Sequence, residues 1–245
     1  MDWLLVLPGI DQDLTASCMA SMRIARDRVI VVDNAPTRLV LPWEPREVVW
    51  TNRNMGVSAS WNEGARRVVQ ERRDMLILCS QAILFGHDGA RDLIDQLHRT
   101  DGHGLEVVGP GWHLVCFHRS TLERCGPFDE GFYPGYFEDT SYLVTMARAG
   151  LPSPRENGRS WPYVVVDHQD RGSALAVHYG LASPDFPRLA ARYCAKWGGD
   201  QGHETFATPW NRDVPLWWWP DAPYDIEDPW GIGACHSAGL YGPGV

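Results

Sequence analysis

The sequence predicts an α/β fold in which a mostly parallel sheet carries helices on both faces. Short apolar segments rich in β-branched residues alternate with segments of helical periodicity, and most of the apolar segments end in Gly, Asp, Asn or Pro. We expect strands at 3–9, 28–33, 47–52, 74–79, 105–110 and 113–120. We expect helices within 13–26, where Leu14, Cys18, Met22 and Ala25 share a face, and at 58–73 and 89–100.

The second half of the chain is less regular. We expect a helix that begins near Glu138, a strand at 161–168 and a helix at 183–197. From Gly198 onward Gly, Pro and Trp dominate and the periodicity is lost. We therefore expect one domain at 1–197 and an irregular extension at 198–245 that packs on it.

Composition narrows the classes of function. The chain has 245 residues, 44% of them hydrophobic, and a formal net charge of −9, which offers no general attraction for nucleic acid or anionic membranes. No segment has 18 uninterrupted apolar residues, the N-terminus lacks the pattern of a secretory signal, and six cysteines are scattered without a C-x-x-C pair. We expect a cytoplasmic protein with reduced thiols and no membrane partner.

Tryptophan is unusually frequent, with 12 residues in the chain. Five of them gather near the C-terminus, at 210, 217, 218, 219 and 230. Such a cluster favours packing or a subunit interface, and stacking on sugars or bases is the alternative.

The segment 128–150, "FDEGFYPGYFEDTSYLVTMARAG", holds the acidic pair Glu138-Asp139 just before a predicted helix. The helix dipole favours carboxylates at such a position, and five aromatic residues precede the pair. A carboxylate in an aromatic wall suits general-base catalysis on a hydroxyl. The alternative is a helix N-cap beside a core aromatic cluster.

This segment resembles the "FDE…EDtD" signature of family 2 glycosyltransferases of the GT-A fold. The resemblance runs from about Leu4 to Asn211, and it implies that Asp139 is the catalytic base and Glu138 its partner. The second Asp of the signature is Ser141 here. The segment 29–37, "VIVVDNAPT", resembles "vvDngStD" of the family, which implies that Asp33 binds the base or ribose. Taken alone, Asp33 would form an Asx-turn.

Three more segments of the resemblance concern the nucleotide-sugar. The segment 52–67 resembles "n.GfaaaNNxG", so that Asn54 and Gly56 would form a turn before a helix whose N-terminus can face a diphosphate. Trp112 and His113 would line the sugar site. Lys196 lies in "YCAKWGGDQGHETFATPWN" (193–211), which resembles a C-terminal motif of glycosyltransferases encoded by bacteriophages, and could cover the donor.

The metal motif of the family is where this chain departs from it. The family's "lllnnDv" supplies an Asp to the metal, but the matching tripeptide is Cys79-Ser80-Gln81, which has no carboxylate. Neutral oxygens are weak ligands for Mn²⁺ or Mg²⁺. Ser80 and Gln81 therefore remain donor-binding candidates. A metal would rely on Gln81 and His168, or cationic and N–H groups would replace it, with Arg53, Arg66 and Lys196 as candidates.

These features together predict an inverting glycosyltransferase that moves a hexose from a nucleotide-sugar, a UDP-sugar by resemblance, to an acceptor hydroxyl. The phage-like motif and the arginines 66, 67, 72 and 73 favour a 5-hydroxymethylated base in phage DNA as acceptor, while the net charge counts against it. A capsid protein or a surface glycan is the alternative acceptor.

Two other classes of function are less well supported. A nucleotidyltransferase would need a Gly- and Arg-rich loop after the first strand, which "LPGIDQDLT" lacks. A non-catalytic nucleotide-sugar binder would suit the missing metal Asp, but not the intact Glu138-Asp139 pair.

Overall fold

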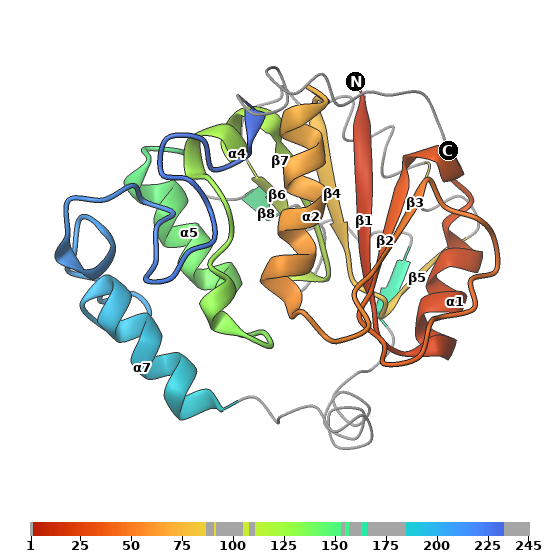
Figure 1. Ribbon diagram of the computed structural model, residues 1–245, viewed down its shortest axis with the longest axis horizontal. Helices are drawn as coiled ribbons and strands as arrows, with labels where there is room; N and C mark the ends of the chain where they lie inside the picture. The colour runs from red at the N-terminus through yellow and green to blue at the C-terminus, as the bar shows by residue number, and fades with distance from the viewer. Residues whose placement is uncertain are drawn as a thin grey trace.

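The computed structural model describes residues 2–86, 91, 105–107, 111–152, 155–156, 163–165 and 185–232. It contains a seven-stranded sheet with helices on both faces, which confirms the predicted α/β class (Figure 1). The strand order is β3-β2-β1-β4-β7-β6-β8. The strands are β1 (Trp3–Gly9), β2 (Val29–Asp33), β3 (Glu47–Trp50), β4 (Met75–Cys79), β6 (Leu105–Val107), β7 (Leu114–His118) and β8 (Arg155–Glu156).

The sheet is mostly parallel, as the sequence predicts, and β7 is the exception. It pairs antiparallel with both β4 and β6, whereas the other neighbours pair in parallel. Few residues separate the end of β6 from the start of β7, and the 3-10 helix η2 (Gly111–His113) lies among them. A short connection favours an antiparallel pair, because parallel strands need a long crossover.

The structure differs from the predicted elements in two places, and one predicted helix lies outside the described residues. The strand expected at 161–168 is β9 (Tyr163–Val165), which pairs with β5 (Ile83–Phe85) in a separate two-stranded sheet. A short helix, α4 (Arg119–Cys125), follows β7 and was not predicted. The helix expected at 89–100 lies outside the described residues, apart from Arg91.

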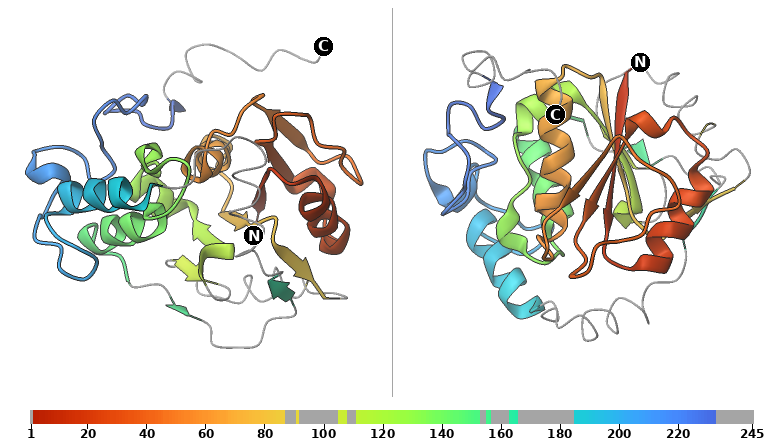
Figure 2. Two further views of the ribbon diagram at one scale, coloured as in Figure 1. Left: turned by 90° about the horizontal axis from the view of Figure 1, so that it is seen from below. Right: turned by 45° about the vertical axis from the view of Figure 1, so that its right-hand side comes forward.

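The alternation of side chains along the strands divides the core between two helical layers. Helix α2 (Val57–Gln70) covers one face and α1 (Gln12–Met22) the other (Figure 2). In β1, Leu4 and Val6 pack towards α2, and Leu5 and Leu7 pack towards α1. None of the described helices combines the length and apolarity needed to cross a membrane.

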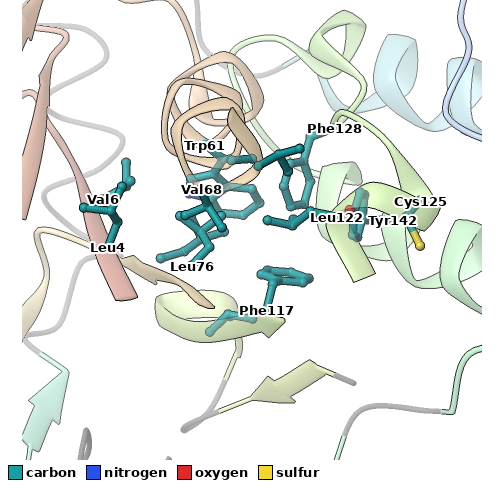
Figure 3. Close-up of a cluster of buried hydrophobic side chains, with 14 of the residues drawn as sticks. Leu4, Val6, Trp61, Val68, Leu76, Phe117, Leu122, Cys125, Phe128 and Tyr142 are labelled. Carbon is teal, nitrogen blue, oxygen red and sulfur yellow. The ribbon is translucent and has the colours of Figure 1, made fainter. Parts of the chain in front are cut away.

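The layer under α2 continues into an aromatic cluster (Figure 3). Trp61 of α2 packs edge-on against Phe128, with the ring centroids 5.2 Å apart. Phe128 stacks on Tyr142 at 4.0 Å, and Phe117 of β7 contacts both rings. Tyr142 belongs to α5 (Glu138–Arg148), so this cluster fixes α5 against the sheet.

The described part of the extension, up to residue 232, packs on this side of the domain (Figure 1). It follows α7 (Phe186–Trp197) and carries one 3-10 helix, η4 (Pro209–Asn211). Trp217, Trp219 and Trp230 are buried, and the indole N–H of Trp230 donates to Leu122 O at 3.3 Å. These three tryptophans therefore pack in the interior of the protein. The boundary between domain and extension at 197/198 stays a prediction.

Candidate active site at the carboxyl ends of the strands

A pocket of about 620 Å³ opens beyond the carboxyl ends of β1 and β4. The strand order reverses between them, because β2 and β3 lie on one side of β1 whereas β4 and β7 lie on its other side. Ligands of open α/β sheets bind at such a switch point. The lining residues are Pro8, Gly9, Ile10, Asn34, Asn54, Gly56, Val57, Trp61, Ser80, Gln81, Trp112, His113, Pro134, Tyr136, Phe137, Glu138, Asp139, Thr140, Phe186 and Gln201.

Gln81 ties the end of β4 to the turn that follows β1. Its Oε1 accepts hydrogen bonds from Ile10 N at 2.9 Å, Asp11 N at 3.1 Å and Thr15 Oγ1 at 3.0 Å. The preceding residue, Ser80, donates its N–H to His113 O at 2.7 Å. The floor of the pocket is therefore a connected network of neutral polar groups.

A second wall comes from the turn before α2. Met55 N donates to Asn34 Oδ1 at 3.1 Å, and Gly56 N donates to Asn54 Oδ1 at 2.9 Å. Gly56 has φ +87°, and a Cβ there would lie 2.9 Å from a ring carbon of Tyr133, so glycine is required. Asn54 and Gly56 thus form the predicted turn.

The start of α2 differs from expectation in one detail. The sequence predicts a helix at 58–73, but the helix begins at Val57 after the cap Gly56, and Ser58 lies inside its first turn. The left-handed glycine, which sequence patterns do not reveal directly, ends the turn two residues earlier. Asn62, on the same helix, braces the segment after α4: its amide accepts from Phe128 N at 2.8 Å and donates to Phe128 O at 2.9 Å.

Glu138 and Asp139 open α5 inside the pocket. The two residues before them, Tyr136 and Phe137, both have left-handed backbones, with φ of +77° and +69°. Such conformations are disfavoured for residues with bulky side chains, and they are found at sites where the surrounding structure imposes them. The loop thereby presents both carboxyl groups at the helix N-terminus, as the sequence predicts.

The two carboxyl groups have different surroundings. Glu138 is buried, and its Oε2 has no hydrogen-bond partner among the described residues. Burial, followed by the charge of Asp139, raises the pKa of Glu138 to about 8, so that Glu138 is mostly neutral at pH 7. Asp139 is half-buried, and its Oδ1 accepts from Thr140 N at 2.6 Å and Thr140 Oγ1 at 3.2 Å.

Aromatic rings line the remaining sides of the pocket. Trp112 stacks on Trp61 with the ring centroids 5.9 Å apart, which places the predicted Trp112-His113 pair in the wall. At the mouth, Tyr136 and Phe186 pair at 4.5 Å although they come from different elements. Their exposed fractions are 52% and 49%, unusually high for large aromatic residues. Together they form an apolar platform at the opening.

Most of the predicted site residues meet in this pocket, but three do not. Asn54, Gly56, Ser80, Gln81, Trp112, His113, Glu138 and Asp139 all line it. Asp33 and Lys196 do not line it, and His168 lies outside the described residues.

Asp33 and Lys196 are engaged elsewhere. The fully buried carboxylate of Asp33 accepts from Ala35 N at 3.0 Å and Leu39 N at 2.9 Å, which is the Asx-turn that its position alone predicts. Lys196 is buried, and its Nζ lies 3.0 Å from Asp129 Oδ2. In this arrangement Lys196 is therefore not placed to cover a donor in the pocket.

Sequence reasoning missed several pocket residues. Asn34 is the neighbour of Asp33, and its amide rather than the Asp33 carboxylate reaches the pocket wall. Phe186 and Gln201 come from the region of α7, and Gln201 Nε2 donates to Thr140 Oγ1 at 2.9 Å. Their contribution depends on how α7 folds back to α5, for which the sequence carries no local signal.

Of the four arginines that favoured DNA, Arg66 and Arg67 lie on α2 and Arg72 and Arg73 follow its end, and three of the four are paired with carboxylates. Arg66 contacts Glu63 at 2.9 Å, Arg67 pairs with Glu47 and Glu63, and Arg73 pairs with Glu71 and Asp2. The N-terminus of α2 borders the pocket, and Arg66 lies nine residues further along the helix, about 14 Å at about 1.5 Å per residue. Arg66, Arg67 and Arg73 are therefore paired with carboxylates, and none of the four arginines lines the pocket.

A smaller cavity of about 590 Å³ adjoins the pocket, with which it shares Asn34 and Asn54. Its lining also includes Arg53 and Glu130. Among the described residues around the two cavities, Arg53 is the one lysine or arginine.

The described residues do not fit a divalent cation. In this part of the chain no group of three or more His, Cys, Asp or Glu could hold a metal ion. Gln81 Oε1 already accepts three hydrogen bonds. Cys79 is fully buried, and burial, followed by Cys18, raises the pKa of its thiol well above the usual value. The thiol is therefore a poor ligand for a hard cation.

Comparisons with known proteins give distant similarities. No family model and no curated protein matches the sequence. A mannosyltransferase from Pyrobaculum calidifontis, solved with GDP-Man and Mn²⁺, has 18% identity and a TM-score of 0.49 over 79% of this chain and 69% of its own. TarS (1–349) of S. aureus has 14% identity and a TM-score of 0.45 over 80% and 70%.

The catalytic domain of Drosophila β1,4-galactosyltransferase 7, solved with xylobiose, has 12% identity and a TM-score of 0.47 over 69% of this chain and 72% of its own. Two of the three proteins are named as glycosyltransferases, a mannosyltransferase and a galactosyltransferase. At identities below 20% and TM-scores below 0.5, these similarities assign neither an activity nor a ligand to this chain.

Proposed function

We propose that this protein is an inverting glycosyltransferase that uses a nucleotide-sugar, with a UDP-sugar as the first candidate. One observation carries the proposal: the Glu138-Asp139 pair opens α5 inside a pocket at the switch point between β1 and β4. The switch point is where doubly wound sheets bind nucleotides. The carboxyl pair supplies the acid–base chemistry that transfer to a hydroxyl needs.

Asp139 is the proposed general base. It removes the proton of the acceptor hydroxyl while the acceptor oxygen attacks the anomeric carbon of the donor sugar. The bond between that carbon and the diphosphate oxygen breaks, and the nucleoside diphosphate leaves with the bonding electrons. Thr140 holds one carboxylate oxygen of Asp139 through two hydrogen bonds, which fixes the group in the pocket. One displacement inverts the anomeric configuration.

Glu138 has a different role in this proposal. Because it is mostly neutral at pH 7, its carboxyl group can donate a hydrogen bond that a carboxylate cannot. Glu138 lines the pocket next to the general base, and its Oε2 is buried without a hydrogen-bond partner among the described residues. The carboxyl group could turn to donate to a substrate hydroxyl, so that Glu138 would orient the sugar while Asp139 takes the proton.

A saccharide hydroxyl is the acceptor that the described surface favours. The Tyr136-Phe186 platform at the mouth suits the apolar face of a sugar ring. DNA needs cationic side chains near the pocket to bind phosphates, but the described lining of the pocket contains no Lys or Arg. Three of the candidate arginines, Arg66, Arg67 and Arg73, are already paired with carboxylates.

The test is a thermal-shift screen of UDP-, GDP- and dTDP-sugars, followed by transfer assays with the donor that binds. A bound donor raises the melting temperature, because it stabilises the folded state by an amount that grows with the logarithm of its concentration over its dissociation constant. Saccharides and duplexes with 5-hydroxymethylated bases are then offered as acceptors, and the products are measured by mass spectrometry. If no nucleotide-sugar stabilises the protein, the proposal is wrong.

A further inference from the structure

The side-chain amide of Gln81 is fixed in one orientation. Ile10 N and Asp11 N are backbone donors, and both lie within 3.1 Å of Oε1. A donor cannot face the amide nitrogen, which is itself a donor, so the oxygen must point to the turn after β1. Thr15 Oγ1 reaches the same oxygen at 3.0 Å. The amide nitrogen is consequently turned away from this turn.

The two ends of this amide differ in what they can bind. Three hydrogen-bond donors direct their positive ends at Oε1, so a cation at that oxygen would have to displace all three. Nε2 makes no hydrogen bond to any described residue, although Gln81 is only 9% exposed and lines the pocket. An N–H₂ group in a pocket wall without a partner is a site for an acceptor oxygen.

The neighbouring side chain extends this site. Ser80 Oγ accepts from Ala82 N at 3.2 Å, which leaves its hydroxyl hydrogen for another acceptor. Ser80 and Gln81 follow the last residue of β4, at the switch point where a diphosphate would lie. Both are neutral donors, placed where a metal-binding protein would need carboxylate ligands.

We propose that Gln81 holds the diphosphate of the donor through its amide N–H₂ group, with Ser80 beside it, and that donor binding does not require a metal ion. This inference rests on the proposed function, because it presupposes that a nucleotide-sugar enters the pocket. It also explains the departure at Cys79-Ser80-Gln81. A carboxylate at position 81 could accept from the turn as Gln81 does, but it would repel the phosphates.

The test compares UDP and GDP binding to the wild-type protein and Gln81→Glu by calorimetry, in chelator and in Mn²⁺. Glutamate keeps the length and the accepting oxygen, but it replaces the N–H₂ group with a second carboxylate oxygen and adds a negative charge. We expect wild type to bind one of these nucleotides in chelator. We expect Gln81→Glu to bind it about 10- to 100-fold more weakly, the range for a hydrogen bond to a charged group. Mn²⁺ should restore part of the loss.

Gln12→Glu is the matched control. The amide of Gln12 accepts from Val40 N and donates to Val40 O, at 2.7 Å each. Gln12 does not line the pocket. Gln12 is the first residue of α1, directly after the turn that Gln81 holds, so a glutamate there adds the same charge nearby without touching the proposed site. We expect the nucleotide affinity of this variant to stay within about twofold of wild type, because a partly exposed charge outside the pocket is screened by salt.

Three results would overturn the inference. One is wild-type binding that disappears in chelator and returns with Mn²⁺, a result that needs no variant and so holds even if Gln81→Glu fails to fold. Another is a folded Gln81→Glu protein that binds as tightly as wild type in chelator. The third is an absence of nucleotide binding in every condition, which would overturn the proposed function as well.

Discussion

Asp129 and Glu138 are both buried carboxyl residues, and the segment between them borders the pocket. Asp129 is fully compensated: Lys196 lies 3.0 Å from one of its oxygens and Arg192 lies 2.7 Å from the other. Glu138 has no cationic partner in the described structure, and its Oε2 makes no hydrogen bond. Both oxygens of Asp129 are therefore paired with cations, whereas one oxygen of Glu138 has no partner among the described residues.

This difference separates a structural group from a functional one. Burying an ionised group is costly unless it is paired, so a buried and paired Asp129 holds α7 to the domain. A buried and unpaired Glu138 stays neutral and leaves hydrogen-bonding capacity for a ligand. The rings of Phe132 and Tyr193 pack against Phe137, one of the two left-handed residues before Glu138. The predictions below test this division.

The largest effect is expected at Asp139, the charged neighbour of Glu138. Asp139→Asn keeps the shape of the side chain and its acceptor for Thr140, but it removes the proton acceptor. Turnover should fall by about 10²- to 10⁴-fold while donor affinity stays close to wild type. Steady-state kinetics and calorimetry measure the two quantities. Turnover near the wild-type value would remove Asp139 from the proposed role.

Asp129→Ala should destabilise the fold strongly. It leaves Lys196 buried without its partner and Arg192 without one of its contacts. Removing one member of a buried ion pair costs about 3–5 kcal/mol. Urea denaturation measures the loss of unfolding free energy. Glu123→Ala is the control, because Glu123 forms an exposed pair with Arg119 and should cost under about 1 kcal/mol. Equal losses in the two variants would contradict the structural role.

Glu138→Gln should remove a pH dependence of stability. The pKa of Glu138 is raised from 4.5 in the unfolded chain to about 8 in the fold, so the folded state binds more protons between these values. Its contribution is thus fully present below pH 4.5 and is lost as the pH rises towards 8. Relative to Glu138→Gln, the wild type should lose at most about 1.4 kcal/mol per pH unit across this window.

The measurement is urea denaturation of both proteins at several pH values from 4.5 to 9. The difference in unfolding free energy should grow with pH and become constant above about pH 8. A difference that does not change with pH would show that Glu138 ionises normally, and that it therefore has no hydrogen to donate to a substrate at neutral pH.

The sequence was sufficient for the parts of this fold that depend on local patterns. Alternating apolar segments predict β1, β2 and β4, and the acidic pair predicts the start of α5. Nothing local predicts that β7 pairs antiparallel with β4 or that Phe186 reaches the pocket, because both depend on how distant segments meet. Eight of the residues that the resemblance singled out line the pocket, but the resemblance could not show how each side chain is used.

Lys196 illustrates that limit. In the sequence it is a cation in a turn-rich segment, which favours a role with phosphates. In the fold it faces the core from α7, where Asp129 and the rings of Phe132, Trp197 and Trp210 surround it. The structural role of Lys196 depends on α7 packing against Asp129, and the local sequence carries no signal for that contact.

Asp33 is a third buried carboxylate residue, beside Asp129 and Glu138. The smallest effect is expected from its substitution. Its two oxygens accept from Ala35 N and Leu39 N, so it resembles Asp129 in being satisfied, but backbone groups replace the cations. Asp33→Ala leaves these N–H groups unpaired in a buried site, and should cost about 1–3 kcal/mol of unfolding free energy. Because the carboxylate does not line the pocket, nucleotide affinity should change by less than about threefold.

Asp33→Asn separates the two roles that the sequence left open for this residue. Asparagine keeps one accepting oxygen for the turn and turns an N–H₂ group towards the other donor, so it should lose less stability than alanine does. If Asp33 instead binds the base or ribose of the donor, both variants should weaken nucleotide binding even where they remain fully folded. Calorimetry below the melting transition distinguishes the cases. Weakening by tenfold or more in a folded variant would make Asp33 a ligand rather than a turn residue.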